Sequence, residues 1–421
     1  MMGSKLFHRP ARAYSSSRFA PGADKEDKGP PSMIETSARR LLAPLNPLYR
    51  LALAFRELSL LWPAQRLRHP VISIGNLSTG GSGKTPLTIA LAWALERRGI
   101  RVDVLSRGYG RESYLAARVD EEGCAEEFGD EPLLIAREAE VPVYVAPQRY
   151  HAGLMAEAEF EAVKAAELHA AEERKPADTP EMPGSAMVEK PGSAMVLVKP
   201  ELEVDPPPIE SSADQEPPPP FPLVHLLDDG FQHRQLARDV DILLLNSSDW
   251  QDWLLPAGNL REPLEAARRA DVIAIPANEP ELEVALHLWG WEKPVWLFHR
   301  IMELPAVISP VAAFCGIARP EQFFAGLEAG GIEIAARFAF PDHFPYTRPA
   351  LDELLTNAQA AGAKSLITTE KDLVRLGSLT ALIPPSMPLT TARLRIKIEN
   401  QSQAIDWLIA QITPPSIPNH L

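Results

Sequence analysis

The sequence predicts an α/β protein with a parallel sheet that helices cover on both faces. From residue 71 onward, short apolar segments alternate with segments of helical periodicity. The apolar segments are nearly continuous, which is typical of strands that are buried on both faces. Such strands alternate with helices in parallel sheets, because each crossover lays a helix on one face. The chain of 421 residues is long enough for two or three domains.

Two series of predicted strands divide the chain. The first predicts a larger domain over residues 71–296, with strands at 71–76, 102–108, 141–146, 222–229, 240–246 and 271–277. The second predicts a smaller α/β domain over residues 297–413, with strands at 312–317, 333–340 and 365–372. Helical patterns in this second part begin at Pro320, after Pro349 and near residue 402. Proline suits the first turn of a helix.

The larger domain is interrupted by a segment, at about residues 176–221, that we predict to be a disordered insertion. It repeats the hexapeptide PGSAMV at 183–188 and 191–196 and contains two proline runs. Repeats, dense proline and excess acid bury too little apolar surface to order a chain. Residues 151–222 carry fifteen acidic and five basic residues, a net charge of −10 out of −14 for the whole chain.

The N-terminal part has two characters. Residues 1–37 are rich in Ser, Arg, Pro and Gly, and we expect a disordered extension there, although a transit peptide or a start site placed too early fits as well. Residues 38–70 predict a basic amphipathic helix. Its apolar positions recur at helical spacing after Pro47, and they are Leu48, Leu51, Phe55, Leu58 and Trp62. Six arginines and one acid in this segment suit an anionic membrane surface, while packing on the chain's own domain is the alternative.

Composition excludes some classes of protein. Cys124 and Cys315 form no ligand-spaced cluster, which fits a reduced compartment without a structural metal. No stretch of eighteen uninterrupted apolar residues is present, so we expect no helix that spans a membrane.

The clearest chemical motif lies in LSTGGSGKTPLTIALAWALERRG, residues 77–99. It matches the phosphate-binding loop G-x-x-x-x-G-K-[ST], except that a serine replaces the first glycine. The eight residues are Ser78, Thr79, Gly80, Gly81, Ser82, Gly83, Lys84 and Thr85. Amides at a helix N-terminus would wrap phosphates, Lys84 would reach the β and γ oxygens, and Thr85 would offer a hydroxyl to Mg²⁺. The loop predicts ATP or GTP, and no NKxD-type guanine-binding motif is present. A glycine turn that contains GKT by chance is the weaker interpretation, because a strand precedes the loop and a helix follows it.

Two carboxylate motifs each have a structural and a chemical interpretation. Asp130 and Glu131 open a helical pattern, so they can cap that helix, or Asp130 can accept a proton from an attacking hydroxyl. Asp228 and Asp229 follow an apolar strand, at the position where carboxylates hold Mg²⁺ in phosphate-binding-loop proteins. A simple DDG turn is the alternative, but it does not explain why Gln232 and a histidine follow so closely.

An arginine in the stiff loop LPAGNLREP, residues 255–263, is the last candidate. Arg261 can clamp a phosphate or stabilise transferred charge, although an isolated arginine is by default a surface residue.

Six motifs in order resemble the tetraacyldisaccharide 4′-kinase family, the lipid A 4′-kinases of Gram-negative envelope biogenesis. They are GNLSTGGSGKTP, SRGYGR, GDEP, DDGFQHRQLARD, LPAGNLREP and TTEKD. The resemblance extends from about residue 40 to residue 412, and the insertion is a departure from it. It implies transfer of the γ-phosphoryl group of ATP, with Mg²⁺, to the 4′-hydroxyl of a tetraacylated glucosamine disaccharide 1-phosphate.

The resemblance also implies roles for individual residues. Asp130 corresponds to the proposed catalytic base, and we place its partner at His343 in FPDHFPY. Lys84 and Arg261 join them in the catalytic set, and Thr85, Asp228 and Asp229 correspond to the metal site. The supporting residues of the site are Ser106, Glu131, Gln232 and Glu262.

The substrate class implied by the resemblance bears on location, because a lipid with several acyl chains stays in the bilayer. We therefore expect peripheral association with the anionic cytoplasmic face of the bacterial inner membrane. We expect no nucleic-acid partner, and no protein partner is evident. Two alternatives remain: another ATPase with a phosphate-binding loop, or a membrane-bound ATP-binding scaffold without catalysis. An ATPase of the metallochaperone type, an example of the first, usually carries metal-binding Cys/His clusters, which this sequence lacks. Intact Lys84, Asp130 and Arg261 argue against the second.

Overall fold

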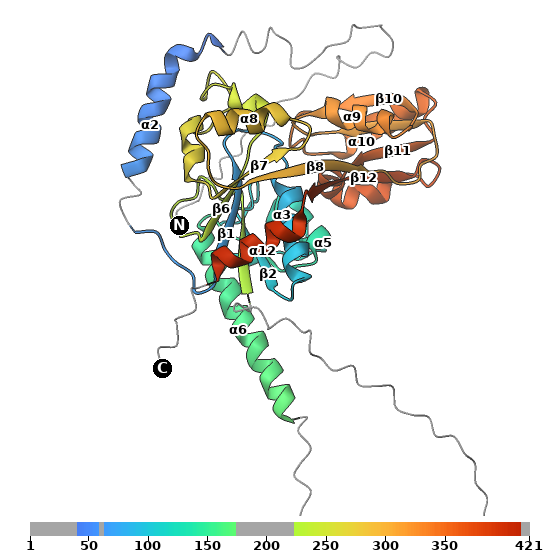
Figure 1. Cartoon of the computed structure of the whole chain (residues 1–421). Helices are drawn as coiled ribbons and strands as arrows, with labels where there is room; N and C mark the ends of the chain where they lie inside the picture. Colours follow the sequence, from blue (N-terminus) through green and yellow to red (C-terminus); the bar gives the residue numbers. More distant parts are fainter. Residues whose placement is uncertain (1–39, 59–62, 174–222, 414–421) are drawn as a thin grey trace, which may run out of the picture.

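The computed structural model describes residues 40–58, 63–173 and 223–413 (Figure 1). The predicted extension over residues 1–37 and the predicted insertion at 176–221 lie outside the described residues, as does Trp62.

Twelve strands are present in the described part of the chain. Their bounds are β1 (Val71–Asn76), β2 (Arg101–Ser106), β3 (Ala117–Arg118), β4 (Val143–Val145), β5 (Leu223–Asp228), β6 (Val240–Leu244), β7 (Val272–Pro276), β8 (Val295–Glu303), β9 (Val311–Cys315), β10 (Ile334–Ala339), β11 (Ser365–Thr369) and β12 (Leu389–Ile398). They form one sheet in the order β10-β9-β11-β12-β8-β7-β6-β1-β5-β2-β4-β3. Neighbours are parallel except β8 with β12 and β3 with β4. The predicted fold class is thus confirmed.

The helices of the described residues cover both faces of this sheet (Figure 1). Their bounds are η1 (Ala43–Leu45), α2 (Asn46–Leu58), α3 (Lys84–Glu96), α4 (Ala125–Phe128), α5 (Asp130–Ala139), α6 (Arg149–Glu173), α7 (Ser247–Trp250), η3 (Leu264–Arg269), α8 (Pro280–Leu288), α9 (Pro320–Ala329), α10 (Arg348–Ala360), α11 (Glu370–Leu376), η4 (Gly377–Leu382) and α12 (Gln401–Ile412). In β6, Ile242 and Leu244 pack into the core with α3, α5 and α12, whereas Leu243 packs into the core with α8. Alternate residues of one strand therefore face two separate apolar layers, which explains its continuous apolar sequence.

The smaller α/β part joins the same sheet through the antiparallel pair of β8 and β12. Strands β9, β10 and β11 and helices α9 and α10 lie together at one side of the molecule in Figure 1. The predicted boundary between residues 296 and 297 falls within β8, and the domain boundaries as such stay a prediction.

The N-terminal helix α2 packs on the body of the protein, as one of its two alternatives predicts, and leaves other apolar residues exposed. Tyr49 and Leu53 pack against the core around α8, and the Tyr49 hydroxyl donates to the Arg261 carbonyl at 3.0 Å. Leu48, Leu51 and Phe55 remain 66%, 52% and 63% exposed. Within the described ranges, no helix combines the length and the apolar content that crossing a bilayer requires.

Candidate active site

The phosphate-binding loop connects β1 directly to α3, as its motif requires. Gly83 precedes the first helical residue, Lys84, with φ of +100°, a left-handed conformation that residues with a side chain rarely adopt. A Cβ at Gly83 would also lie 3.2 Å from Ile396. The Ser82 carbonyl accepts a hydrogen bond from the Arg300 guanidinium at 2.6 Å, and Thr85 is buried in the first turn of α3. These contacts fix the loop at the helix N-terminus, a place where proteins bind anions.

The loop that carries Arg261 is fastened to the phosphate-binding loop by backbone hydrogen bonds. Thr79 N donates to the Asn259 carbonyl at 2.9 Å, and Arg261 N donates to the Leu77 carbonyl at 2.7 Å. The guanidinium then forms a two-pronged ion pair with Asp229, with N–O distances of 2.9 and 3.0 Å. Arg261 is therefore part of the site and not an ordinary surface arginine.

Lys84 lies beside the same carboxylate. Its Nζ donates to Asn76 Oδ1 at 3.0 Å and lies 3.6 Å from Asp229 Oδ1. Burial raises the pKa of Asp229, but the charges of Lys84 and Arg261 lower it by more. The pKa therefore lies well below its ordinary value. An ionised Asp229 thus holds two cations next to each other at the mouth of the loop.

Asp228 lies on the other side of this cluster, at the end of β5 and beside β1. Its carboxylate oxygens are each 3.5 Å from a hydroxyl, one of Ser106 and one of Thr88. Burial raises the pKa of Asp228, and the nearby charges of Glu131 and Asp229 raise it further. A buried carboxylate that neighbouring negative charges repel in this way suits a hard divalent cation, so the residues present fit Mg²⁺.

Two of the predicted supporting residues, Gln232 and Glu262, contact the backbone and side chains around this cluster. Gln232 Nε2 donates to the Asn76 carbonyl at 2.8 Å and fixes the end of β1. Glu262 pairs with Arg269 at 2.5 Å, and the Arg269 guanidinium lies over the Phe231 ring.

A second cluster surrounds Asp130, the first residue of α5. Gly129 precedes it with φ of +92°, and a Cβ at Gly129 would lie 3.0 Å from the Tyr109 carbonyl. The Asp130 carboxylate is 2.8 Å from Arg375 Nε and 3.1 Å from His343 Nδ1. The structure therefore places His343 next to Asp130, in a loop more than two hundred residues away along the chain.

Charge around Asp130 keeps it ionised. Burial raises its pKa, but the hydrogen bond with His343 and the charge of Arg375 lower it more, so that the pKa is well below its ordinary range. The same hydrogen bond raises the pKa of His343. A carboxylate held in this way stays ionised at neutral pH. It can therefore orient a hydroxyl group and accept its proton during a reaction.

Glu131 connects the two clusters. Its carboxylate accepts a hydrogen bond from Lys371 Nζ at 2.7 Å. The charge of Lys371 lowers the pKa of Glu131, burial raises it, and the charge of Lys84 lowers it further. Glu131 therefore interacts electrostatically with a lysine of the phosphate-binding loop and with a lysine of α11.

Three residues of the site escaped sequence reasoning. Asn76, Lys371 and Arg375 make some of its shortest contacts. Asn76 and Lys371 lie within motifs GNLSTGGSGKTP and TTEKD, and the position of Asn76 at the end of a buried strand was the available signal. Arg375 follows TTEKD on α11, and nothing in its local sequence marks it.

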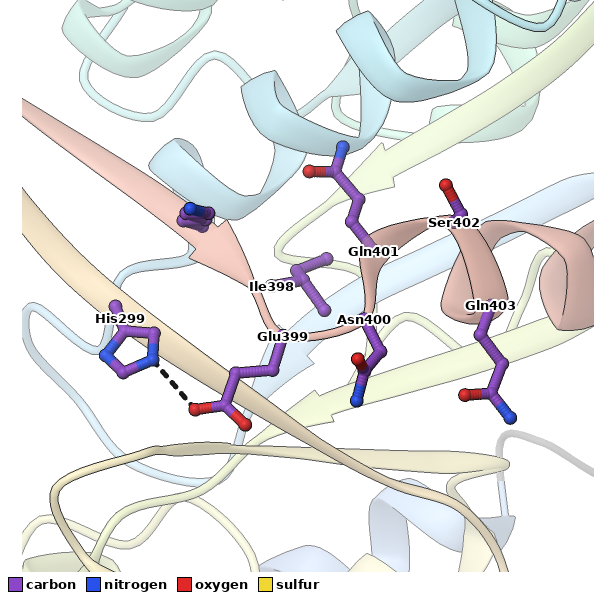
Figure 2. Close-up of a pocket in the computed structure, with 8 residues that line it drawn as sticks. His299, Ile398, Glu399, Asn400, Gln401, Ser402 and Gln403 are labelled. Carbon is purple, nitrogen blue, oxygen red and sulfur yellow. Dashed lines mark hydrogen bonds and ion pairs between the residues drawn. The ribbon is translucent and has the colours of Figure 1, made fainter.

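A pocket of about 600 Å³ lies apart from these clusters, where β8, β12 and the start of α12 meet. His299 Nε2 lies 2.8 Å from Glu399 Oε1. Figure 2 shows this pair and the lining residues Asn400, Gln401, Ser402 and Gln403, which follow Glu399 along the chain. The residues that line this pocket belong to none of the motifs, so we assign it no chemistry.

Comparison with known proteins decides the family. A family model described as tetraacyldisaccharide-1-P 4′-kinase matches residues 38–413. The chain belongs to the tetraacyldisaccharide 4′-kinase family.

Relatives named tetraacyldisaccharide 4′-kinase match this family member over most of their length. The protein of Koribacter versatilis is 36% identical over 380 residues, which cover 87% of this chain and 97% of the relative. The protein of Geobacter metallireducens is 32% identical, with 82% and 90% covered. A solved structure described as an apo form of LpxK from Aquifex aeolicus in complex with ATP is 29% identical, with a TM-score of 0.59, and 89% of this chain and all of that chain are covered.

Proposed function

We propose that this chain transfers the γ-phosphoryl group of ATP to the 4′-hydroxyl of a tetraacylated glucosamine disaccharide 1-phosphate, giving lipid IVA. The observation that carries the proposal is the pairing of a phosphate-binding loop with a carboxylate–histidine pair in a member of this kinase family. Glu131 pairs with Lys371, and the charges of Lys371 and, to a smaller extent, Lys84 lower its pKa.

The phosphate side of the site supplies positive charge where the transferred group needs it. Lys84 and Arg261 are held beside each other by Asp229, so their charges can offset the negative oxygens of the terminal phosphates. When bound, Mg²⁺ would supply further neutralisation, and Asp228, Thr85 and Asp229 are the residues that we propose to hold it. Ser106 fixes the orientation of Asp228.

The acceptor side supplies the base. In the transfer, a bond forms between the 4′-oxygen and the γ-phosphorus, the bond from that phosphorus to ADP breaks, and the hydroxyl proton passes to Asp130. A weakly basic carboxylate suffices because the proton leaves late in a loose phosphoryl transfer. His343 and Arg375 hold the carboxylate in place, which favours positioning over strong basicity.

We also propose that α2 brings the protein to the cytoplasmic face of the inner membrane. Its exposed apolar face, Leu48, Leu51 and Phe55, lies next to the exposed Arg50, and this combination suits an anionic bilayer surface. Tyr49 and Leu53 of the same helix contact the body of the protein, so membrane attachment would lie close to Arg261 and the active site.

Phosphorylation of the lipid itself tests the proposed function. The purified chain is incubated with ATP, Mg²⁺ and the disaccharide 1-phosphate lipid, and mass spectrometry follows the bisphosphorylated product. We expect product with the natural chain, and with Asp130→Asn we expect loss of product with ATP binding retained. Asp352→Asn on the surface of α10 serves as the control and should keep full activity. A natural chain that hydrolyses or binds ATP but forms no lipid product would refute the kinase proposal.

A further inference from the structure

A cluster of histidines and carboxylates lies at the opposite end of the strands from the phosphate-binding loop. His69 precedes β1, His225 lies early in β5, Asp103 lies early in β2, and Glu157 comes from α6. Among the described residues, His69, Glu157 and His225 are a set whose ligand atoms all lie within 4.8 Å of one another. The active-site groups of β1 and β5 lie at the other ends of these strands, so the cluster is separate from the proposed chemistry.

The surroundings of His225 suit a metal ligand. Its ring is fully buried, and Nδ1 lies 2.7 Å from Asp103 Oδ1. When Nδ1 donates its proton to Asp103, Nε2 presents a lone pair on the opposite side of the ring. Nε2 has no partner within 3.5 Å, and it faces Glu157 Oε1 at 3.6 Å, close enough for an ion pair. A carboxylate behind a histidine is the arrangement that orients metal-bound imidazoles.

The remaining two ligands have matching spacing. His69 Nδ1 is 3.3 Å from Glu157 Oε1, and the amides of Arg68 and His69 donate to the same oxygen and orient the carboxylate. Two ligands bound at about 2.0–2.1 Å to a tetrahedral Zn²⁺ lie roughly 3.3–3.4 Å apart. The observed separations of 3.3 and 3.6 Å are close to this tetrahedral edge.

The two carboxylates of the cluster also favour a bound cation. Asp103 and Glu157 are both buried, so their two negative charges are poorly solvated. A proton on His225 would offset one of them, whereas a divalent cation bound by two neutral imidazoles would offset both.

We propose that His69, Glu157 and His225 bind one Zn²⁺ ion, with Asp103 orienting His225 and a fourth position left for water. Two nitrogen ligands and one carboxylate favour Zn²⁺ over Mg²⁺, which prefers oxygen. The ion would join α6 to the starts of β1 and β5, so its role is structural. Cysteine usage suggested no structural metal, and ligands at residues 69, 157 and 225 are too far apart in sequence to form a recognisable motif.

Zinc titration of the whole chain tests this proposal. The untagged protein is stripped with a chelator and titrated with Zn²⁺ by calorimetry in excess Mg²⁺, and Co²⁺ is added separately to record its visible absorption. We expect one Zn²⁺ per chain, intense tetrahedral Co²⁺ bands, and a higher thermal midpoint with Zn²⁺. His69→Gln should weaken Zn²⁺ binding by at least about a hundredfold, and Asp103→Asn by roughly 10- to 100-fold.

His69→Gln is the test variant, and two control variants accompany it. His69 lies at the rim of the cluster and is partly exposed, so His69→Gln can fold where a change at fully buried His225 fails. His299→Gln removes a comparable His–Glu pair on the surface, and Cys124→Ser removes the exposed thiol; both should bind Zn²⁺ like the natural chain. Absence of binding by the natural chain, or equal affinity in His69→Gln, would mean that the cluster holds only a proton. His69→Gln should still phosphorylate the lipid, so this result is independent of the kinase proposal.

Discussion

Asn76, Lys84, Asp229 and Arg261 show how single residues prepare the site for phosphate. Two cations that would repel each other are held together by one carboxylate and by the Asn76 amide oxygen. Asp229 adopts φ of +48°, a left-handed conformation that is uncommon for a residue with a side chain. Such strain is maintained only where the surrounding contacts require it, and here these contacts fix the position of both cations.

Replacing Lys84 tests the phosphate side of the site. Lys84→Ala removes a charge that we propose to face the terminal phosphates, so kcat/KM for lipid phosphorylation should fall by roughly 10²–10³-fold, and ATP should bind more weakly. Product formation and calorimetric ATP titration measure the two effects. Lys164→Ala on the exposed surface of α6 is the matched control and should change neither. If Lys84→Ala were as active as the natural chain, the role that we propose for the phosphate-binding loop would be wrong.

Replacing Arg375 tests how Asp130 is kept ionised. The positive charge of Arg375 contributes to the lowered pKa of Asp130, so Arg375→Gln should raise that pKa. As the proposed base, Asp130 works only when ionised, and therefore the acid limb of the pH profile of kcat/KM should move to higher pH. Arg375→Lys keeps the charge and should restore part of the shift. An unmoved profile in a folded Arg375→Gln protein would show that Arg375 serves packing alone.

The residues of the site were unequally predictable from sequence. Lys84, Thr85 and Asp228 follow from strand and loop context, because ligands gather at the carboxyl ends of parallel strands. His343 next to Asp130 came from family resemblance, since a contact between α5 and a loop of the second part has no local signature. Arg375 also has no local signature and was not predicted, because only the folded chain brings it to Asp130.

At the scale of elements, continuous apolar runs predicted the buried strands well but did not reveal β8 or β12. Strand β8 alternates between more and less exposed residues, and β12 mixes buried, partly buried and exposed residues, because each covers an apolar core with part of its side chains only. An alternating strand carries a weaker signal than a fully buried one. The connection between the two parts of the sheet was therefore the feature that sequence reasoning lacked.

Helix α2 gives the prediction that belongs to this scale. Changing Leu48, Leu51 and Phe55 together to Ser should weaken binding to vesicles of anionic phospholipid by about a hundredfold or more, because the apolar area that enters the bilayer is lost. Flotation of the protein with vesicles measures the effect. Val284 and Leu288 on α8 are 58% and 85% exposed, and changing both to Ser provides the control. Vesicle binding that survives in the α2 variant would place the membrane contact elsewhere.

At the scale of the whole molecule, one sheet holds both halves of the proposed site. The phosphate-binding loop follows β1, whereas Lys371 and Arg375 lie on α11, which follows β11. Strand β12 lies between β11 and β8 and so connects the two regions. Strand β12 contacts both α5, which carries Asp130, and α11, so we expect it to help hold the proposed base in place.

Arg395 of β12 is the residue through which this expectation can be tested. Its guanidinium is 2.6 Å from Glu138 of α5 and 2.8 Å from Glu370 of α11, and all three side chains are mostly buried. Arg395→Met leaves two buried carboxylates without their cation, which should lower the free energy of unfolding by about 3 kcal/mol. The turnover rate should fall by roughly tenfold or more, because small displacements of a base slow transfer strongly, while ATP affinity should change less. Arg393→Met on the same strand is the control, since Arg393 is 54% exposed and 3.9 Å from Glu138. Urea unfolding and steady-state kinetics on both variants measure these effects, and equal behaviour of the two would show that the halves of the site are held together by other contacts.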